Sequence, residues 1–224
     1  MMKFNWYRGG ALALLTLFSA VCPAKADHTV ISADKNEHDE QIERVNTDGQ
    51  GGVYFIESDV TLKYSGRGTF ENNTASGEGG AIYNNNGTLT ANNVEFEYNS
   101  GKAGGAIYNY AGTVEISQNA DFQYNAATDG NGGAIYNDRG EVTVNSAYFN
   151  GNAAAKGNGG AVFSNSTVTL LGRTTFYDNS AKVGGAVYGE GDAGLQFLGE
   201  AKFFDNKATE GNGGAIYGTL MSVN

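Results

Sequence analysis

Residues 79–99 read GGAIYNNNGTLTANNVEFEYN, and most of the chain repeats this stretch with small changes. Its opening phrase, Gly-Gly-Ala-Ile-Tyr, alternates along the chain with its closing phrase, Phe-x-x-Asn, which returns every 26 or 27 residues. The phenylalanines of the closing phrase are Phe70, Phe96, Phe122, Phe149, Phe176 and Phe203. A fixed period of this length indicates one structural unit that is copied and stacked about six times.

Each unit contains three short segments that we expect to be strands. In the quoted unit these are residues 81–83, 88–90 and 94–96, and the last two alternate apolar with polar residues. Such alternation is typical of strands with one buried face, and the Asn-Gly and Asp-Gly pairs between them supply turns. No segment has the apolar stripe of a helix. The sequence therefore predicts an all-β fold, a parallel β-helix of about six coils with 26–27 residues per coil.

The repeated residues are assigned structural roles. We expect the glycine pairs to allow bends where a side chain would collide with the next coil. The phenylalanines should form an internal aromatic stack, and the asparagines a ladder of amides at a turn. These structural positions are Gly79, Gly80, Phe96, Asn99, Gly104, Gly105, Phe122, Asn125, Gly132, Gly133, Phe149, Asn152, Gly159, Gly160, Phe176, Asn179, Gly184, Gly185, Phe203, Asn206, Gly213 and Gly214.

The direction of the tyrosines in Gly-Gly-Ala-Ile-Tyr is left open by the pattern. If Ile82 and its counterparts point inward, Tyr83 and its counterparts form an exposed aromatic stripe; the opposite parity buries them beside Ala81. One copy has Phe163 in place of tyrosine, so the hydroxyl is dispensable there. This favours burial over a binding role.

The first 26 residues are predicted to be a signal peptide. Lys3 and Arg8 supply the positive start, residues 11–21 the apolar stretch, and Ala24-Lys25-Ala26 the cleavage site. We therefore expect an exported protein, located in the outer membrane, at the cell surface, in secreted form or in the periplasm.

Residues 27–50 are predicted to form a polar leader or N-terminal cap, and residues 51–224 the repeat domain. The single Cys, Pro and Trp of the chain all lie before residue 27, so disulfides are excluded from the repeats. The net charge is −10 for the whole chain, and removal of residues 1–26 leaves 11 basic against 24 acidic residues. This balance argues against nucleic acid as a partner.

The alternating Gly-Gly-Ala-Ile and Phe-x-x-Asn phrases over residues 51–217 resemble the repeats of the polymorphic outer membrane proteins of chlamydiae and related autotransporter passengers. The resemblance implies a right-handed parallel β-helix that is displayed on the cell surface and used in adhesion to host cells. Two departures are the absence of cysteine after residue 26 and of a membrane-anchoring pattern after Leu220. They indicate a truncated or passenger-only product, or a secreted relative.

Asp178 and Asp205 occupy equivalent positions in neighbouring coils and are the candidate chemical site. Two stacked carboxylates could hold Ca²⁺, the one cofactor considered, or act as the acid and base of a glycoside hydrolase. They could equally be turn residues that face solvent. A polysaccharide lyase would need a basic residue near bound calcium, and Arg139 and Arg173 fall at unrelated points of their coils. No catalytic residue is predicted.

The leading functional prediction is an exported, noncatalytic adhesion or interaction module for a host-cell or matrix protein or glycan. The first alternative is a carbohydrate-active β-helix that uses Asp178 and Asp205. The second is a structural fragment that self-associates through its last coil, at Gly213 to Tyr217, because an open strand edge is an assembly site.

Overall fold

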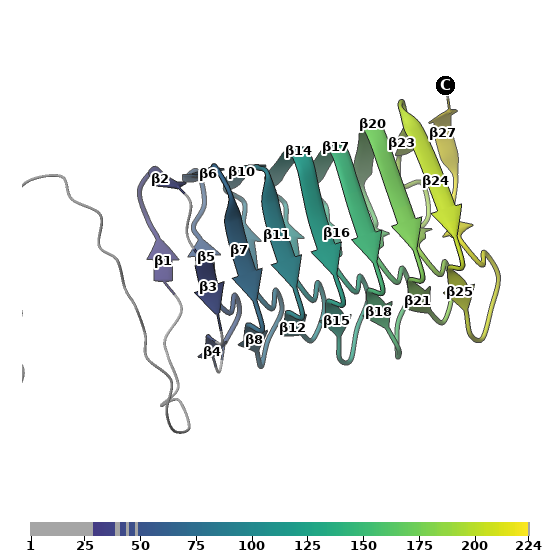
Figure 1. The fold of residues 1–224 in the computed structure, drawn as a ribbon, viewed down its shortest axis with the longest axis horizontal. Coiled ribbons are helices and arrows are strands. Elements are labelled where there is room, and N and C mark those ends of the chain that lie inside the picture. Colours follow the sequence, from purple (N-terminus) through teal and green to yellow (C-terminus); the bar gives the residue numbers. More distant parts are fainter. Residues whose placement is uncertain (1–28, 39–40, 44, 48, 224) are drawn as a thin grey trace, which may run out of the picture.

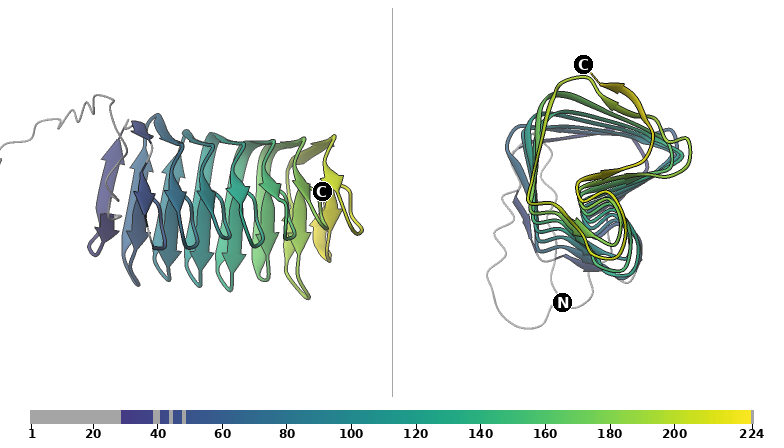
Figure 2. Two further views of the ribbon diagram at one scale, coloured as in Figure 1. Left: turned by 90° about the horizontal axis from the view of Figure 1, so that it is seen from below. Right: turned by 90° about the vertical axis from the view of Figure 1, so that its right-hand side faces the viewer.

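The computed structural model describes residues 29–38, 41–43, 45–47 and 49–223, and all its regular elements are β-strands. The strands lie side by side along the long axis of the molecule (Figure 1). Viewed along that axis, the coils lie over one another (Figure 2, right). Neighbouring strands pair in parallel, so the fold is the predicted right-handed parallel β-helix. No described helix is long and apolar enough to cross a membrane.

The first sheet has eight strands and carries the Ala-Ile-Tyr segments. Its strands, in spatial order, are β1 (Thr29–Ile31), β5 (Tyr54–Ile56), β9 (Ile82–Asn85), β13 (Ile107–Tyr110), β16 (Ile135–Asp138), β19 (Val162–Ser164), β22 (Val187–Gly189) and β26 (Ile216–Tyr217).

The second sheet has twelve strands and turns a corner, so that each coil crosses it twice. Before the corner lie β2 (Lys35–His38), β6 (Thr61–Ser65), β10 (Thr88–Asn92), β23 (Leu195–Phe197) and β27 (Leu220–Val223). After the corner lie β3 (Gln41–Glu43), β7 (Gly68–Glu71), β11 (Val94–Glu97) and β24 (Glu200–Phe204). The long strands β14 (Thr113–Gln123), β17 (Glu141–Asn150) and β20 (Thr167–Tyr177) run through the corner.

The third sheet has seven strands of two residues each. They are β4 (Asn46–Thr47), β8 (Thr74–Ala75), β12 (Ser100–Gly101), β15 (Ala126–Ala127), β18 (Ala153–Ala154), β21 (Ser180–Ala181) and β25 (Lys207–Ala208).

The helix has about seven coils, one more than the six that the phrases predict. The additional coil comes from strands β1 to β4, which pair in parallel with β5 to β8. Counting the repeated phrases missed this coil, because its strands pair through backbone hydrogen bonds, which require neither Gly-Gly nor Phe-x-x-Asn. The predicted leader or cap, residues 27–50, thus holds strands in its described part, whereas the predicted signal peptide lies outside the described residues.

The phenylalanines form a buried column through the core. Consecutive rings from Phe70 to Phe203 are stacked, with centroids 4.7 to 5.0 Å apart. All but the last are buried, and Phe203 is partly buried. This is the internal aromatic stack that the repeat predicts.

The asparagines of Phe-x-x-Asn form the predicted ladder, in which each amide bonds both along and across the coils. The backbone N–H and Nδ2 of Asn99 both donate to Oδ1 of Asn125, each at 3.0 Å. Nδ2 of Asn99 also donates to the carbonyl of Phe70 at 2.8 Å. The pattern continues to Asn206, so these buried amides stabilise the turn that follows the phenylalanine strand.

A second ladder, which the sequence analysis missed, follows the tyrosine strands. Nδ2 of Asn84 donates to Oδ1 of Asn109 at 2.8 Å, and Asn109 donates in the same way to Asn137. Asn137 continues to the hydroxyl of Ser164. All four side chains are buried, so the carboxyl ends of these first-sheet strands are also fixed by side-chain hydrogen bonds.

The two positions of the glycine pair require glycine for different reasons. Gly79 has φ of +69°, a conformation that side chains rarely adopt. Gly80 would place a Cβ only 2.0 Å from the carbonyl oxygen of Gly105 in the next coil. The first glycine is thus required by its own backbone, and the second by the close approach of the neighbouring coil.

The structure settles the direction of the tyrosines. Ala81 and Ile82 are both buried, because the chain bends at the glycine pair before strand alternation begins. Tyr83 and its counterparts lie on the opposite face, where they form a column with centroids 4.7 to 5.3 Å apart. Burial is the largest cause that raises the pKa of Tyr83 to about 12. Tyr83 and Phe163 are buried within this column, whereas Tyr217 at its end is 41% exposed.

Candidate functional site

Five exposed aromatic side chains lie on the outer side of the phenylalanine strands and their following turns. We call this set the aromatic face: Tyr98, Tyr124, Tyr148, Tyr177 and Phe204. Their exposed fractions run from 37 to 50%. Tyr148, Tyr177 and Phe204 each lie next to an inward-pointing phenylalanine of their strand and therefore point outward. Tyr98 and Tyr124 lie instead at the turn that follows their strand. Exposed aromatic side chains gathered on one face make that face a candidate interaction surface.

Two of these tyrosines occupy a backbone conformation that does not favour them. Tyr98 and Tyr124 have φ of 53° and 52°, in the left-handed region where bulky residues are rare. Other coils have Asn72, Gly151 or Asp178 at this turn position. The two rings stack at 5.1 Å. A tyrosine kept there at a backbone cost of about 1 kcal/mol or more points to a role for its side chain at the surface.

A hollow of about 290 Å³ lies beside Tyr148, at the corner of the second sheet. The register between neighbouring strands is interrupted at this corner. The unpaired stretch contains two residues in β14 and two in β20, whereas in β17, which lies between them, it contains only Ser146. We attribute the hollow to this shorter corner. It is lined by Asn119, Ala120, Asp121, Ser146, Ala147, Tyr148, Arg173 and Thr175.

Asp121 is the chemically distinctive residue of the hollow. Its Oδ2 accepts a hydrogen bond from Nε2 of Gln123 at 2.9 Å, whereas its Oδ1 is shielded from solvent and has no protein partner. Burial raises the pKa of Asp121, the Gln123 bond opposes the shift, and the charge of Glu95 adds to it. An acceptor left unpaired in this way costs about 1–3 kcal/mol.

Arg173 and Ser146 complete the polar lining. The backbone N–H of Arg173 donates to Oγ of Ser146 at 3.3 Å, and its Nε donates to Glu200 at 2.9 Å. The pKa of the Tyr148 phenol is raised by burial, and further by Asp121, Tyr177 and Tyr124. Because Tyr148 both lines the hollow and belongs to the aromatic face, the hollow adjoins that face.

Carboxylates dominate the surroundings toward the N-terminal coils. Glu95 and Asp121 are register neighbours, and Glu97 lies two residues after Glu95. Burial raises the pKa of Glu97, and so do the charges of Glu95, Asp121 and Glu71. The field at this side of the aromatic face is thus negative.

The predicted pair Asp178 and Asp205 occupies, in later coils, the same turn position as Tyr98 and Tyr124 of the aromatic face. Both side chains are exposed, and both residues have positive φ, 51° and 55°. Their shared turn conformation, which Asp tolerates well, accounts for their equivalence. No group of three metal-ligating side chains occurs among the described residues. Binding of Ca²⁺ by this pair stays a prediction.

The sequence analysis missed the hollow, although the sequence carries a signal for it. Phe149 follows Val142 by seven residues, whereas Phe122 follows Val114 by eight and Phe176 follows Val168 by eight. Such a length difference predicts unequal corners in stacked coils. Arg173, which seemed to stand at an unrelated point, lines the hollow with Asp121 from two coils away. Arg139 lies elsewhere, over the ring of Tyr110.

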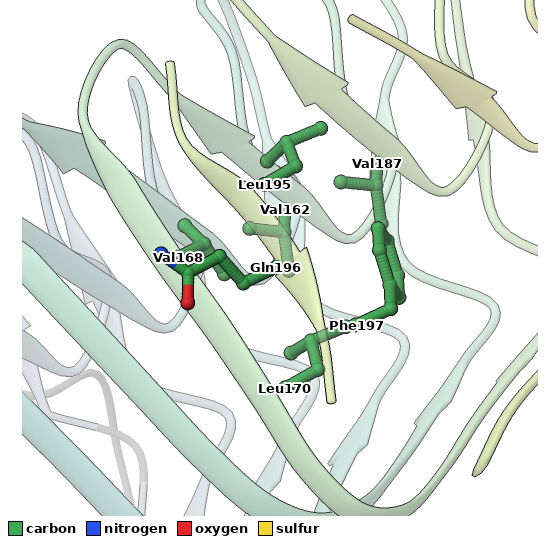
Figure 3. A pocket seen from close by; sticks show the side chains of 7 residues that line it. All are labelled: Val162, Val168, Leu170, Val187, Leu195, Gln196 and Phe197. Carbon is green, nitrogen blue, oxygen red and sulfur yellow. The ribbon is translucent and has the colours of Figure 1, made fainter. Parts of the chain in front are cut away.

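A second space, inside the last coils, is part of the core. Figure 3 shows its lining side chains, which include Val162, Leu170, Leu195 and Phe197, converging between strands. The space among them leaves no room for a water molecule. It therefore contributes packing and is no ligand site.

A family model described as the Chlamydia polymorphic membrane protein repeat matches residues 68–85, 93–110, 117–138, 173–190 and 201–219. Each matched segment contains one Phe-x-x-Asn and the Gly-Gly-Ala phrase that follows it. Comparison with curated proteins and with solved structures gave no match. The repeat matches and the stacked coils agree, and we conclude that the chain carries polymorphic membrane protein-like repeats.

Proposed function

We propose that the chain is exported and acts at the cell surface or in secreted form as a noncatalytic adhesion module for a host-cell or matrix protein or glycan. Three observations support this: the repeat of a membrane-protein family, the rigid β-helix, and the aromatic face. The aromatic face carries the proposal, because tyrosine is enriched in the binding surfaces of proteins.

The strongest single observation is the pair Tyr98 and Tyr124, which remain at left-handed turn positions although Asn or Gly fits that backbone better. Stability of the coil does not require tyrosine there, since Asn72 and Gly151 occupy the same turn in neighbouring coils. Backbone strain and ring stacking then roughly balance, and a surface function gives a reason for tyrosine at these two turns.

The test separates binding from folding. The purified protein, carrying a fluorescent label, is added to cultured host cells and to matrix-coated surfaces, beside the double variant Tyr98→Asn, Tyr124→Asn. Relief of backbone strain should offset the lost ring stacking, so we expect the variant to unfold at about the same urea concentration as the wild type.

Binding by the double variant should fall about tenfold, because two exposed aromatic anchors are removed. The matched control is Glu115→Ala together with Thr143→Ala, two neighbouring substitutions on the outer side of the other half of the sheet. Wild-type protein that binds none of the surfaces, or a double variant that binds as well as the wild type, would overturn the proposal.

A further inference from the structure

We propose that Tyr98 and Tyr124 form a site of oxidative cross-linking, at which a haem peroxidase with hydrogen peroxide joins their rings as dityrosine and so links two coils covalently. The two rings lie in neighbouring coils and are stacked, with centroids 5.1 Å apart and planes inclined by 13°. Both side chains are exposed, by 50% and 45%. The inference is independent of the adhesion proposal, because the reaction needs no binding partner at the aromatic face.

The backbone holds the two phenols in register. Tyr98 and Tyr124 occupy the same turn position in their coils and have almost the same φ, 53° and 52°. The backbone N–H of Tyr98 donates to the carbonyl of Gln123, the residue before Tyr124, at 2.9 Å. Two equivalent turns that are joined in this way send their side chains in the same direction, and the nearly parallel rings agree with this.

The stacked arrangement suits the coupling of two phenols. The peroxidase removes one electron and one proton from each hydroxyl, which leaves two phenoxyl radicals whose unpaired electrons lie in π orbitals directed at the facing ring. A carbon–carbon bond then forms between the ring carbons next to the hydroxyls. Each of these carbons loses its proton while its phenol oxygen gains one, which restores the aromatic ring. The two electrons and two protons removed first reduce hydrogen peroxide to two water molecules, so the protein becomes lighter by two hydrogen atoms.

The neighbouring turns confine the reaction to this pair. They carry Asn72 in the coil before and Gly151 in the coil after, and neither residue has a phenol. Gly151 leaves the space that the Tyr124 ring occupies, since a Cβ on Gly151 would lie 2.5 Å from Cδ1 of that ring. The Tyr124 hydroxyl also accepts a hydrogen bond from Nδ2 of Asn150 at 3.4 Å. Among the described residues, Tyr98 is therefore the one phenol stacked on Tyr124.

The tyrosine column of the first sheet is less suited to coupling, although its rings are stacked as closely. Tyr83 is buried, and burial is the largest cause that raises the pKa of Tyr83 to about 12. Loss of its phenol proton is therefore disfavoured. At the end of the column Tyr217 is exposed, but its stacked neighbour Tyr188 is only partly exposed. Among the stacked tyrosine pairs of the described residues, both rings are exposed only at Tyr98 and Tyr124.

The experiment treats the intact purified protein, in dilute solution, with a haem peroxidase and hydrogen peroxide. Trypsin cuts after Lys102, which lies between the two tyrosines, so mass spectrometry should find peptides 68–102 and 103–139 joined, with the loss of two hydrogen atoms. A denaturing gel should show the treated protein as a monomer. No joined peptides under conditions that couple free tyrosine, or joined peptides in dimers alone, would overturn the inference.

Matched variants locate the cross-link. Tyr98→Phe and Tyr124→Phe keep the stacked rings but remove one phenol, so each should abolish the joined peptides. The control is Tyr83→Phe, because Tyr83 and its stacked neighbour Tyr108 lie on the same two peptides. This control should give joined peptides at the wild-type level. Joined peptides that persist in Tyr98→Phe, or that vanish in Tyr83→Phe, would place the cross-link elsewhere and overturn the inference.

The cross-link should also stabilise the stacked coils. It joins residues 26 apart in the sequence, and closing such a loop restricts the unfolded chain as a disulfide does. The treated wild type should therefore melt about 5 °C or more above treated Tyr98→Phe, which controls for oxidation at other residues. Equal melting temperatures after complete cross-linking would show that the bond does not hold the two coils together.

Discussion

At the residue scale, the buried asparagines join neighbouring coils through several hydrogen bonds each. Asn125 accepts two hydrogen bonds from Asn99 and donates to Asn152 and to the carbonyl of Phe96. Each bond joins groups that are sealed from water. Removal of one amide therefore leaves several buried donors and acceptors without partners.

Asn125→Ala is accordingly expected to lower the free energy of unfolding by about 2–4 kcal/mol. The exposed residue Asn145, on a neighbouring strand, provides the control, and Asn145→Ala should change it by less than about 0.5 kcal/mol. Urea denaturation followed by circular dichroism measures both. Similar midpoints for the two variants would show that the ladder contributes little.

At the element scale, the parallel register of the strands places acidic residues of neighbouring coils next to one another. Glu71 and Glu97 are register neighbours, and so are Glu95 and Asp121. The raised pKa of Glu97 means that the folded state holds its proton more tightly than the unfolded chain does. The ionised form is therefore penalised in the folded protein at neutral pH.

Glu97→Gln should for this reason raise stability at pH 7, because it removes a disfavoured charge. The gain should shrink as the pH falls through the raised pKa, and vanish below about 4, where the carboxyl is protonated in both states. Urea midpoints at pH 7 and pH 3.5 test this, with the exposed Glu115→Gln as control. A gain at pH 3.5 as large as at pH 7 would contradict the electrostatic explanation.

The glycine pair offers a test of coil stacking. A Cβ on Gly185 would lie 2.1 Å from the carbonyl oxygen of Gly214, whereas a Cβ on Gly214 would meet only the carbonyl oxygen of Asn206, at 3.7 Å. Gly185→Ala should destabilise the protein by at least about 3 kcal/mol, and Gly214→Ala by less than about 1 kcal/mol. Thermal unfolding of both variants measures the difference, and equal melting temperatures would contradict the stacking.

The sequence predicted those elements whose side chains are the same in every coil. Phe96 and Asn99 recur at a fixed period, and a period translates directly into a column. The first coil escaped prediction because strands such as β1 pair through backbone groups that carry no residue signal. The hollow escaped because it arises from a difference between coils at Ser146, and a search for repeats looks for what coils share.

At the scale of the whole molecule, the last described coil has the side chains of an interior one. Phe203, Asn206 and Gly214 recur there, although Phe203 is only partly buried and no following coil faces Gly214 in the described part of the chain. Among the described residues the strands of this coil have a partner on one side only, and self-association through the other edge stays a prediction.

Static light scattering at increasing concentration should show a mass above that of the monomer. Gly214→Ala should abolish the association and leave the monomer stable, because the added Cβ would collide only with a coil stacked on that edge. A wild type that stays monomeric at all concentrations, or a variant that associates equally well, would contradict the prediction.

The whole account rests on coils that lie directly above one another in register. Lys63, Thr90, Glu115, Thr143, Thr169 and Gln196 form one such column. Pulsed electron paramagnetic resonance between spin labels at Lys63 and Gln196, with Cys22 replaced by Ala, tests it most directly. Five strand spacings of about 4.8 Å predict a narrow distance near 24 Å, and a label at Thr169 instead should shorten it by about one spacing. A broad distribution, or a distance that does not change between the two label pairs, would contradict the stacked β-helix.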